Sequence, residues 1–94
     1  MSHRPAARPV VINYPQETET ITFPDYTFRF GVSDATGVEV SINGGPWLAC
    51  REALGYYWFD WCGYKSGTHE IRVRARLPHG RVEESGSRHL RVDL

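Results

Sequence analysis

The stretch HEIRVRARL, residues 69–77, decides the fold class of this 94-residue chain. Its apolar side chains alternate with polar or charged ones at every second position. The apolar set is Ile71, Val73, Ala75 and Leu77, and the polar set is Glu70, Arg72, Arg74 and Arg76. Successive side chains of a β-strand point to opposite faces, so this pattern predicts a strand with one face in a core and the other in solvent.

The same alternation continues in both directions from this strand, and helical spacing is almost absent. Upstream it recurs over residues 10–14, 19–23, 26–32 and 38–43. Downstream it runs from Val82 to the end of the chain, with a predicted bulge at residues 85–87. Turn residues separate the segments, as in Asn43-Gly44-Gly45, which tolerates positive φ. The sequence therefore predicts an all-β, antiparallel β-sandwich of about seven strands.

Three stretches carry a resemblance to a known family. VEVSINGGPW (38–47), GYYWFDW (55–61) and SGTHEIRVRARLPHGRV (66–82) are similar to segments of bacterial Ig-like and fibronectin type III-like modules. The resemblance implies an Ig-like sandwich, and such modules are mostly non-catalytic spacers, adhesion elements or binding accessories. With the alternation it predicts one core, made of Phe28, Phe30, Val40, Ile42, Tyr57, Phe59, Trp61, Ile71, Val73 and Ala75.

Length and charge narrow the choice of function. Ninety-four residues suit a single domain, which we place at residues 9–94 after a flexible arm at residues 1–8. Eleven acidic side chains balance eleven basic ones, which argues against a general electrostatic grip on nucleic acid or on an anionic membrane. The sequence contains no nucleophile elbow, phosphate loop or dinucleotide fingerprint, so we expect no enzyme and no cofactor.

The aromatic run Tyr56–Trp61 is the best candidate for a site. The resemblance places Tyr57, Phe59 and Trp61 in the core, which leaves Tyr56 and Trp58 on the outer face with rings about 6–7 Å apart on one flat surface. These two rings either contact a partner or a glycan, or they brace the sheet beside Arg29. Trp47, expected on a short strand next to 38–43 and in the opposite sheet, either covers the core or binds a ligand.

A row of arginines is the second candidate. Arg72, Arg74 and Arg76 project from one face of a strand, and Arg91 is expected on the neighbouring strand. One interpretation is a solvated face on which Glu39 and Glu83 or Glu84 neutralise the row. The other is a face for an anionic partner, such as phosphate or an acidic protein surface.

The cysteines and histidines are weaker candidates for a functional site. Cys50 and Cys62 have neither redox nor zinc-ligand spacing, but both are expected near strand ends, so a disulfide is a weaker alternative to two free thiols. The four histidines (His3, His69, His79 and His89) show no metal-ligand spacing, so we expect no metal site.

We therefore predict a non-catalytic binding or assembly module that contacts a protein partner or a second copy of itself. The alternative is a carbohydrate-binding accessory domain that stacks glycans on Tyr56 and Trp58. We expect neither a nucleic-acid nor a membrane partner. Residues 1–11 lack the apolar segment of a signal peptide, which indicates the cytoplasm if Met1 is the natural start, and an extracellular location if a leader has been removed.

Overall fold

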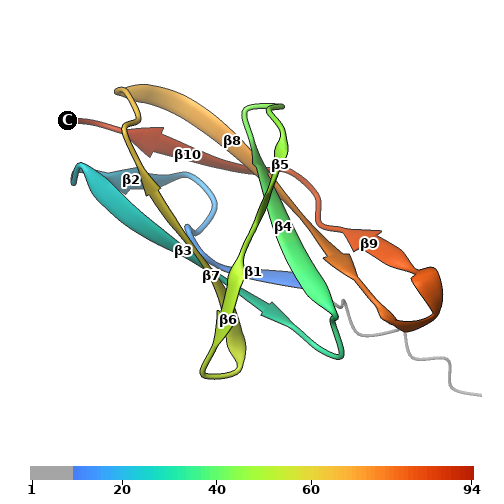
Figure 1. Cartoon of the computed structure of the whole chain (residues 1–94). Coiled ribbons are helices and arrows are strands. Elements are labelled where there is room, and N and C mark those ends of the chain that lie inside the picture. Colours follow the sequence, from blue (N-terminus) through green and yellow to red (C-terminus); the bar gives the residue numbers. More distant parts are fainter. Residues whose placement is uncertain (1–9) are drawn as a thin grey trace, which may run out of the picture.

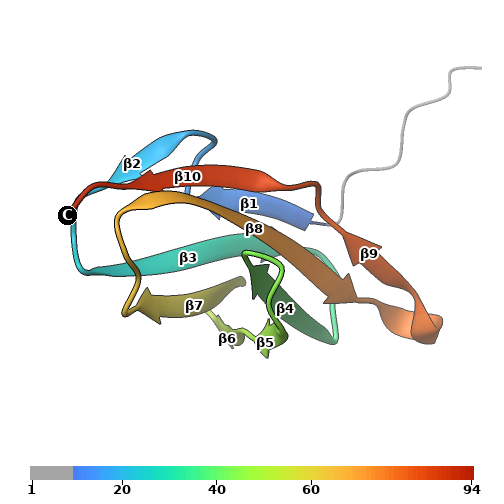
Figure 2. The ribbon, with the colours of Figure 1, turned by 90° about the horizontal axis from the view of Figure 1, so that it is seen from above.

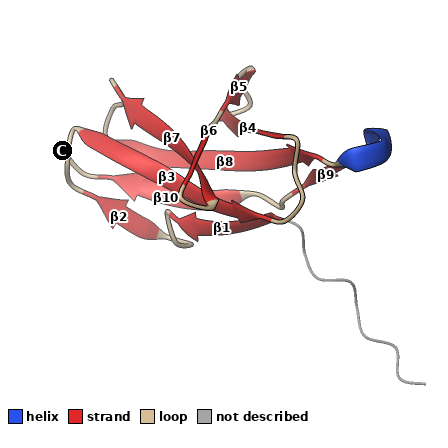
Figure 3. Ribbon diagram, turned by 60° about the horizontal axis from the view of Figure 1, so that its bottom comes forward, coloured by secondary structure: helices blue, strands red, loops and turns tan. Residues whose placement is uncertain are grey.

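A computed structural model describes residues 10–94, which form ten β-strands and one short 3₁₀ turn. The predicted arm at residues 1–8, and His3 within it, lies outside the described residues. The strands are β1 (Val10–Tyr14), β2 (Glu19–Ile21), β3 (Asp25–Val32), β4 (Gly37–Ile42), β5 (Trp47–Ala49), β6 (Arg51–Ala53), β7 (Tyr56–Cys62), β8 (Gly67–Arg76), β9 (Val82–Glu84) and β10 (Arg88–Val92). The 3₁₀ turn, η1 (Pro78–Gly80), lies at the tip of the β8–β9 hairpin (Figure 3).

The strands form two sheets that pack face to face (Figures 1 and 2). One sheet has four strands in the order β1-β3-β7-β6. The other has the order β2-β10-β8-β4-β5, and β9 pairs with the distal half of β8. Pairing is antiparallel except between β2 and β10, which run parallel. The all-β sandwich predicted from the sequence is confirmed, with ten strands in place of about seven.

The additional strands are short ones of three residues each. The segment after Pro46 was expected to form a single short strand, but the chain leaves β5 at Cys50 and crosses to the other sheet as β6 (Figure 1). The last stretch is likewise divided into β9 and β10, which lie along the same side of β8. Three residues, Ser85–Ser87, stand opposite Arg72 and Val73 alone, so the predicted bulge is confirmed.

Eight of the ten predicted core residues are buried, and the other two, Ile42 and Phe59, are half-buried. Ile42 is the last residue of β4, and Phe59 lies just beyond the residues of β7 that pair with β6, so both are less covered. Further buried side chains complete the core: Val10, Ile12, Ile21, Val38, Leu90 and Val92. Phe23, which the alternation over residues 19–23 places on the same face as Ile21, is 67% exposed because β2 ends at Ile21 and the chain turns before β3.

The Asn43-Gly44 turn has the geometry that its residues predict. Both have positive φ, 54° for Asn43 and 72° for Gly44, and the amide of Gly45 donates a 2.9 Å hydrogen bond to the carbonyl of Ile42. Positive φ at both central residues is what a type I′ turn requires. Among residues 10–94, no helix is long and apolar enough to cross a membrane.

Candidate interaction face

The outward-facing side chains of the four-stranded sheet gather in one row. The register places Tyr14 of β1 opposite Arg29 of β3, Arg29 opposite Trp58 of β7, and Trp58 opposite Arg51 of β6. Tyr56 lies two residues before Trp58, on the same face. We call this surface, made of Tyr14, Arg29, Tyr56 and Trp58, the aromatic face. Its members come from three strands that are spread over residues 14–58 of the sequence.

Arg29 lies at the centre of the aromatic face. Its guanidinium carbon is 4.9 Å from the centroid of the Tyr14 ring and 4.4 Å from that of the Tyr56 ring, which is cation–π distance. Its Nε atom is buried and has no hydrogen-bond partner among residues 10–94. Six of the eight arginines in residues 10–94 form ion pairs, whereas Arg29 and Arg91 do not. Since Arg91 is exposed, Arg29 is the described arginine that lacks both a counter-ion and full hydration.

Tyr56 and Trp58 point outward as predicted, but they do not form a flat platform. Their ring centroids are 6.0 Å apart, within the expected range, while the ring planes are inclined at 73°. The prediction of one flat face is therefore wrong, because Tyr56 turns to stack on Arg29. The indole nitrogen of Trp58 donates a 2.8 Å hydrogen bond to the carbonyl of Ala53, which braces the β6–β7 hairpin. Both side chains are half-buried.

A shallow hollow of about 510 Å³ lies beside Tyr56 on the same face. It forms where Gly31 of β3 carries no side chain, and Val11, Asn13, Tyr56 and Leu54 surround it. Val11 is 49% exposed and Leu54 is 90% exposed, so two apolar side chains of the rim are open to solvent. Gly31 and Leu54 are not among the residues that the sequence pattern predicts for a site.

Trp47 lies on the outer face of the other sheet and does not cover the core. It stands opposite Ser41 of β4, which on its other side stands opposite Arg72 of β8. The guanidinium carbons of Arg72 and Arg74 are 5.7 and 4.4 Å from the centroid of its ring. The core-lid interpretation is therefore wrong, whereas the prediction that Trp47 belongs to the sheet opposite Tyr56 is confirmed.

Carboxylates neutralise the arginine row. Glu39 lies 2.8 Å from Arg74 and 3.2 Å from Arg76, and these cations hold the pKa of its carboxyl below the ordinary value. Glu84 pairs with Arg72 at 3.8 Å, while Glu83 pairs with Arg81 at 3.0 Å. Arg91 stands opposite Thr68, at the far end of β8 from the row. The geometry favours the solvated, salt-bridged interpretation over an anion-binding face.

The two cysteines are free. Arg51 pairs with Trp58, which places Cys50 near the level of Phe59, three residues from Cys62. At about 3.3 Å per residue this separation is near 10 Å, too long for a disulfide, and the chain at Cys50 is also leaving the sheet. Burial, and to a smaller extent the Glu39 carboxylate, raises the pKa of the Cys50 thiol to about 12. Cys62 is exposed.

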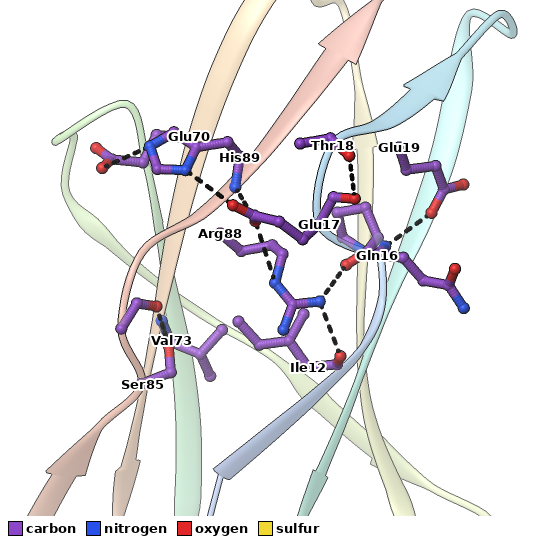
Figure 4. A network of polar contacts seen from close by, with 12 residues as sticks. Ile12, Gln16, Glu17, Thr18, Glu19, Glu70, Val73, Ser85, Arg88 and His89 are labelled. Carbon is purple, nitrogen blue, oxygen red and sulfur yellow. Dashed lines mark hydrogen bonds and ion pairs between the residues drawn. The ribbon is translucent and has the colours of Figure 1, made fainter.

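A cluster of charged and polar side chains lies around the start of β10 (Figure 4). The ring of His89 lies between two carboxylates, 3.3 Å from Glu17 and 3.6 Å from Glu70. Arg88 contacts the same Glu17 at 3.5 Å. Within residues 10–94, no three His, Cys, Asp or Glu side chains are grouped so as to hold a metal ion. The contacts are those of a structural ion-pair network.

Comparison with known proteins supports the fold. No protein-family model and no curated protein matches the chain. Among solved structures, a fibronectin(III)-like module of Clostridium thermocellum CbhA matches with a TM-score of 0.73 and 23% identity, over 88% of this chain and 93% of the module. The chain has a fibronectin type III-like fold. The resemblance seen in the sequence is thus confirmed.

Two other solved structures contain this fold within longer chains. An endo-β-1,4-mannanase from Thermotoga petrophila matches with a TM-score of 0.73 and 17% identity, over 89% of this chain and 19% of the enzyme. An engineered protein matches with a TM-score of 0.78 and 19% identity, over 97% of this chain and 21% of its own length. In both of these chains, the part that resembles this protein is about a fifth of the length.

Proposed function

We propose that this fibronectin type III-like chain is a non-catalytic module that makes protein–protein contacts through its aromatic face. The observation that carries the proposal is Arg29, a half-buried cation without a counter-ion between Tyr14 and Tyr56. Tyrosine, tryptophan and arginine are the residues that most often anchor protein interfaces, since they bury a large area with little loss of rotamer entropy. A partner carboxylate would supply the missing charge.

The contrast with the opposite sheet supports the choice of face. There, Glu39 and Glu84 already neutralise the arginine row, so little binding energy is left for a charged partner. On the outer side of the four-stranded sheet, the one ion pair within residues 10–94 joins Arg51 to Asp60 at 3.1 Å and leaves Arg29 aside. The uncompensated charge and the exposed apolar side chains of the rim lie on the same side of the molecule.

Carbohydrate binding is the second candidate, and the hollow beside Tyr56 is the observation in its favour. An aromatic ring next to the Asn13 amide and the Ser33 hydroxyl, both of which line the hollow, can stack on and hydrogen-bond to a sugar. Against it, the 73° angle between Tyr56 and Trp58 leaves no continuous stacking platform. We therefore place protein contact first.

Site-specific photocrosslinking tests the proposal. A benzoylphenylalanine placed at Tyr56 should crosslink to protein, whether a second copy or another chain in extracts of the native cells. The same probe at Arg91, on the exposed outer face of the other sheet, should not. Crosslinking at neither position, together with retardation of the chain in polysaccharide gels, would replace protein contact by the carbohydrate function. Equal crosslinking at both positions would remove the aromatic face as the site.

A further inference from the structure

Leu54 occupies an unfavourable backbone position at the tip of the β6–β7 hairpin. The strands are joined by Leu54 and Gly55, with φ of 56° and 80°, and Ala53 pairs with Tyr56 across the turn. These are again the two positive φ angles that a two-residue turn of type I′ requires. A γ-branched side chain rarely adopts that conformation, because its Cβ is crowded by the following carbonyl oxygen.

Another turn of the same chain has the residues that usually occupy these two positions. The β4–β5 connection has nearly the same φ angles at two successive positions, and there the first position is Asn43, followed by Gly44. Asparagine tolerates positive φ, and Asn-Gly is the preferred pair for the turn. Leu54 gains nothing from the fold in return for its strain, since 90% of its surface is exposed. Backbone strain at a residue that makes no compensating contact within the monomer indicates that the residue is kept for a contact with another molecule.

Leu54 and the hollow over Gly31 lie side by side on the aromatic face. The hollow is lined by Val11 and Tyr56 as well as by Leu54 itself, so an apolar knob and a depression with both apolar and polar lining share one patch. Building on the proposed function, we propose that the partner is a second copy of this chain. Leu54 of each copy is seated in the hollow over Gly31 of the other.

The arrangement fits a closed two-fold pair. An isologous dimer uses the same patch on both subunits, so that patch must contain both the knob and the depression. A knob and a depression on different faces would instead generate an open filament. The formal net charge of zero means that two copies do not repel each other at long range.

The size of the face sets the strength of the pairing. Seven residues of β7 span about 23 Å, and four strands cover about 19 Å, which gives roughly 440 Å². Stable dimers bury about 800 Å² on each subunit. We therefore expect a dimer that dissociates on dilution, not a permanent one.

Sedimentation velocity over a dilution series of the purified chain tests this inference. The wild-type chain should pass from dimer to monomer, and Leu54→Asn should raise the dimer dissociation constant at least tenfold. At a concentration where both chains are monomers, Leu54→Asn should melt about 4–8 °C higher, because asparagine relieves the turn. Lower affinity with higher stability is the signature of a residue retained for binding.

Gly31→Val provides a second variant that fills the hollow from within. A Cβ at Gly31 would lie 3.5 Å from the side-chain oxygen of Asn13, an ordinary contact, and valine suits a strand. It should also weaken the dimer at least tenfold while the fold persists. Val82→Asn is the matched control, since Val82 is 49% exposed on β9 of the other sheet, and it should leave the dissociation constant unchanged.

Three results would overturn the inference. They are a wild-type monomer at every concentration, a dimer unaffected by Leu54→Asn and Gly31→Val, and an equal loss of dimer with Val82→Asn. If the wild-type chain is monomeric but a crosslinker at Tyr56 captures a different protein, the self-pairing is wrong and the proposed function stands. If that crosslinker captures no protein, both fail.

Discussion

Arg88 reaches across the open edge of the sandwich to Ile12. Its guanidinium donates hydrogen bonds to the backbone carbonyls of Ile12 and Pro15, 3.3 and 3.1 Å away (Figure 4). Arg88 stands opposite Ile71 of β8, so its side chain leaves β10 on the core side, toward β1 in the other sheet. The bond to Ile12 occupies a carbonyl of β1, the edge strand of its sheet, and Pro15 follows β1 directly.

Arg88→Ala should therefore lower the free energy of unfolding by about 2 kcal/mol, since it removes charge-assisted hydrogen bonds from a largely buried position. Urea denaturation followed by tryptophan fluorescence measures the change. Arg91→Ala is the control, because Arg91 is exposed and forms no ion pair among residues 10–94, and it should change stability by less than about 0.5 kcal/mol. Equal losses in the two variants would show that Arg88 does not join the sheets.

Acid should weaken the fold in part through Glu39. Hydrogen bonding to Arg74, opposed by burial and helped by the charges of Arg74 and Arg76, holds the pKa of Glu39 below its ordinary value of 4.5. A carboxyl with a lowered pKa in the folded state contributes its stability above the unfolded pKa and loses it as the pH falls through the folded pKa. The wild-type chain should thus lose stability below about pH 4.5.

Glu39→Gln should reduce this acid loss without removing it. Hydrogen bonds also lower the pKa of Glu17, chiefly from the His89 backbone, and of Asp60, chiefly from Thr27, and both remain in the variant. Urea midpoints at pH 7 and pH 3.5 give the comparison. A variant that loses as much stability between these values as the wild type would show that the Glu39 ion pairs do not contribute to folding.

Much of the fold was predictable because long strands with one buried face show a clear alternation of apolar and polar residues in the sequence. The alternation in β3 and β8 identified Phe28, Phe30, Ile71 and Val73 as core, and all four are fully buried. Three-residue strands carry too few side chains to show a period. The crossing at Cys50 was missed for that reason.

For the aromatic face, the outward direction of the side chains could be predicted from the sequence, but the orientation of the rings could not. Counting in twos from the core residues placed Tyr56 outside. The tilt of its ring depends on Arg29 and Tyr14, which belong to strands far away in the sequence. Leu54 was readable as an unusual residue before a hairpin glycine, but its meaning rests on its exposure and on the hollow beside it, which only the packed sheet reveals.

The two cysteines should react with alkylating reagents at very different rates. Cys62 is exposed, whereas Cys50 is half-buried with a pKa raised to about 12, and the thiolate is the reactive form. Iodoacetamide at pH 8 should therefore modify Cys62 promptly, and Cys50 only after denaturant is added. Mass spectrometry of digested protein counts the adducts. Rapid modification of both residues would show that the segment between β5 and β6 is open, and no modification of either would indicate a disulfide.

Substitutions in the aromatic strand β7 distinguish most directly between side chains that contribute to binding and side chains that contribute to folding. Tyr56→Ser with Trp58→Ser removes the stacking on Arg29 and the bond to Ala53, a loss of about 1–2 kcal/mol of folding free energy. Tyr57→Ala with Phe59→Ala removes inward rings, and Phe59 stacks on the buried Phe28. Large-to-small changes of this kind cost roughly 3–5 kcal/mol for a buried aromatic, so this variant should be largely unfolded at 25 °C.

Circular dichroism melts and crosslinking at low concentration distinguish the two variants. The outward variant should keep a cooperative melt and lose association, because its rings belong to the interface. The inward variant should lose the melt itself. If the outward variant is as unstable as the inward one, Tyr56 and Trp58 serve to brace the sheet. Association would then have to depend on Leu54 and the hollow over Gly31 alone.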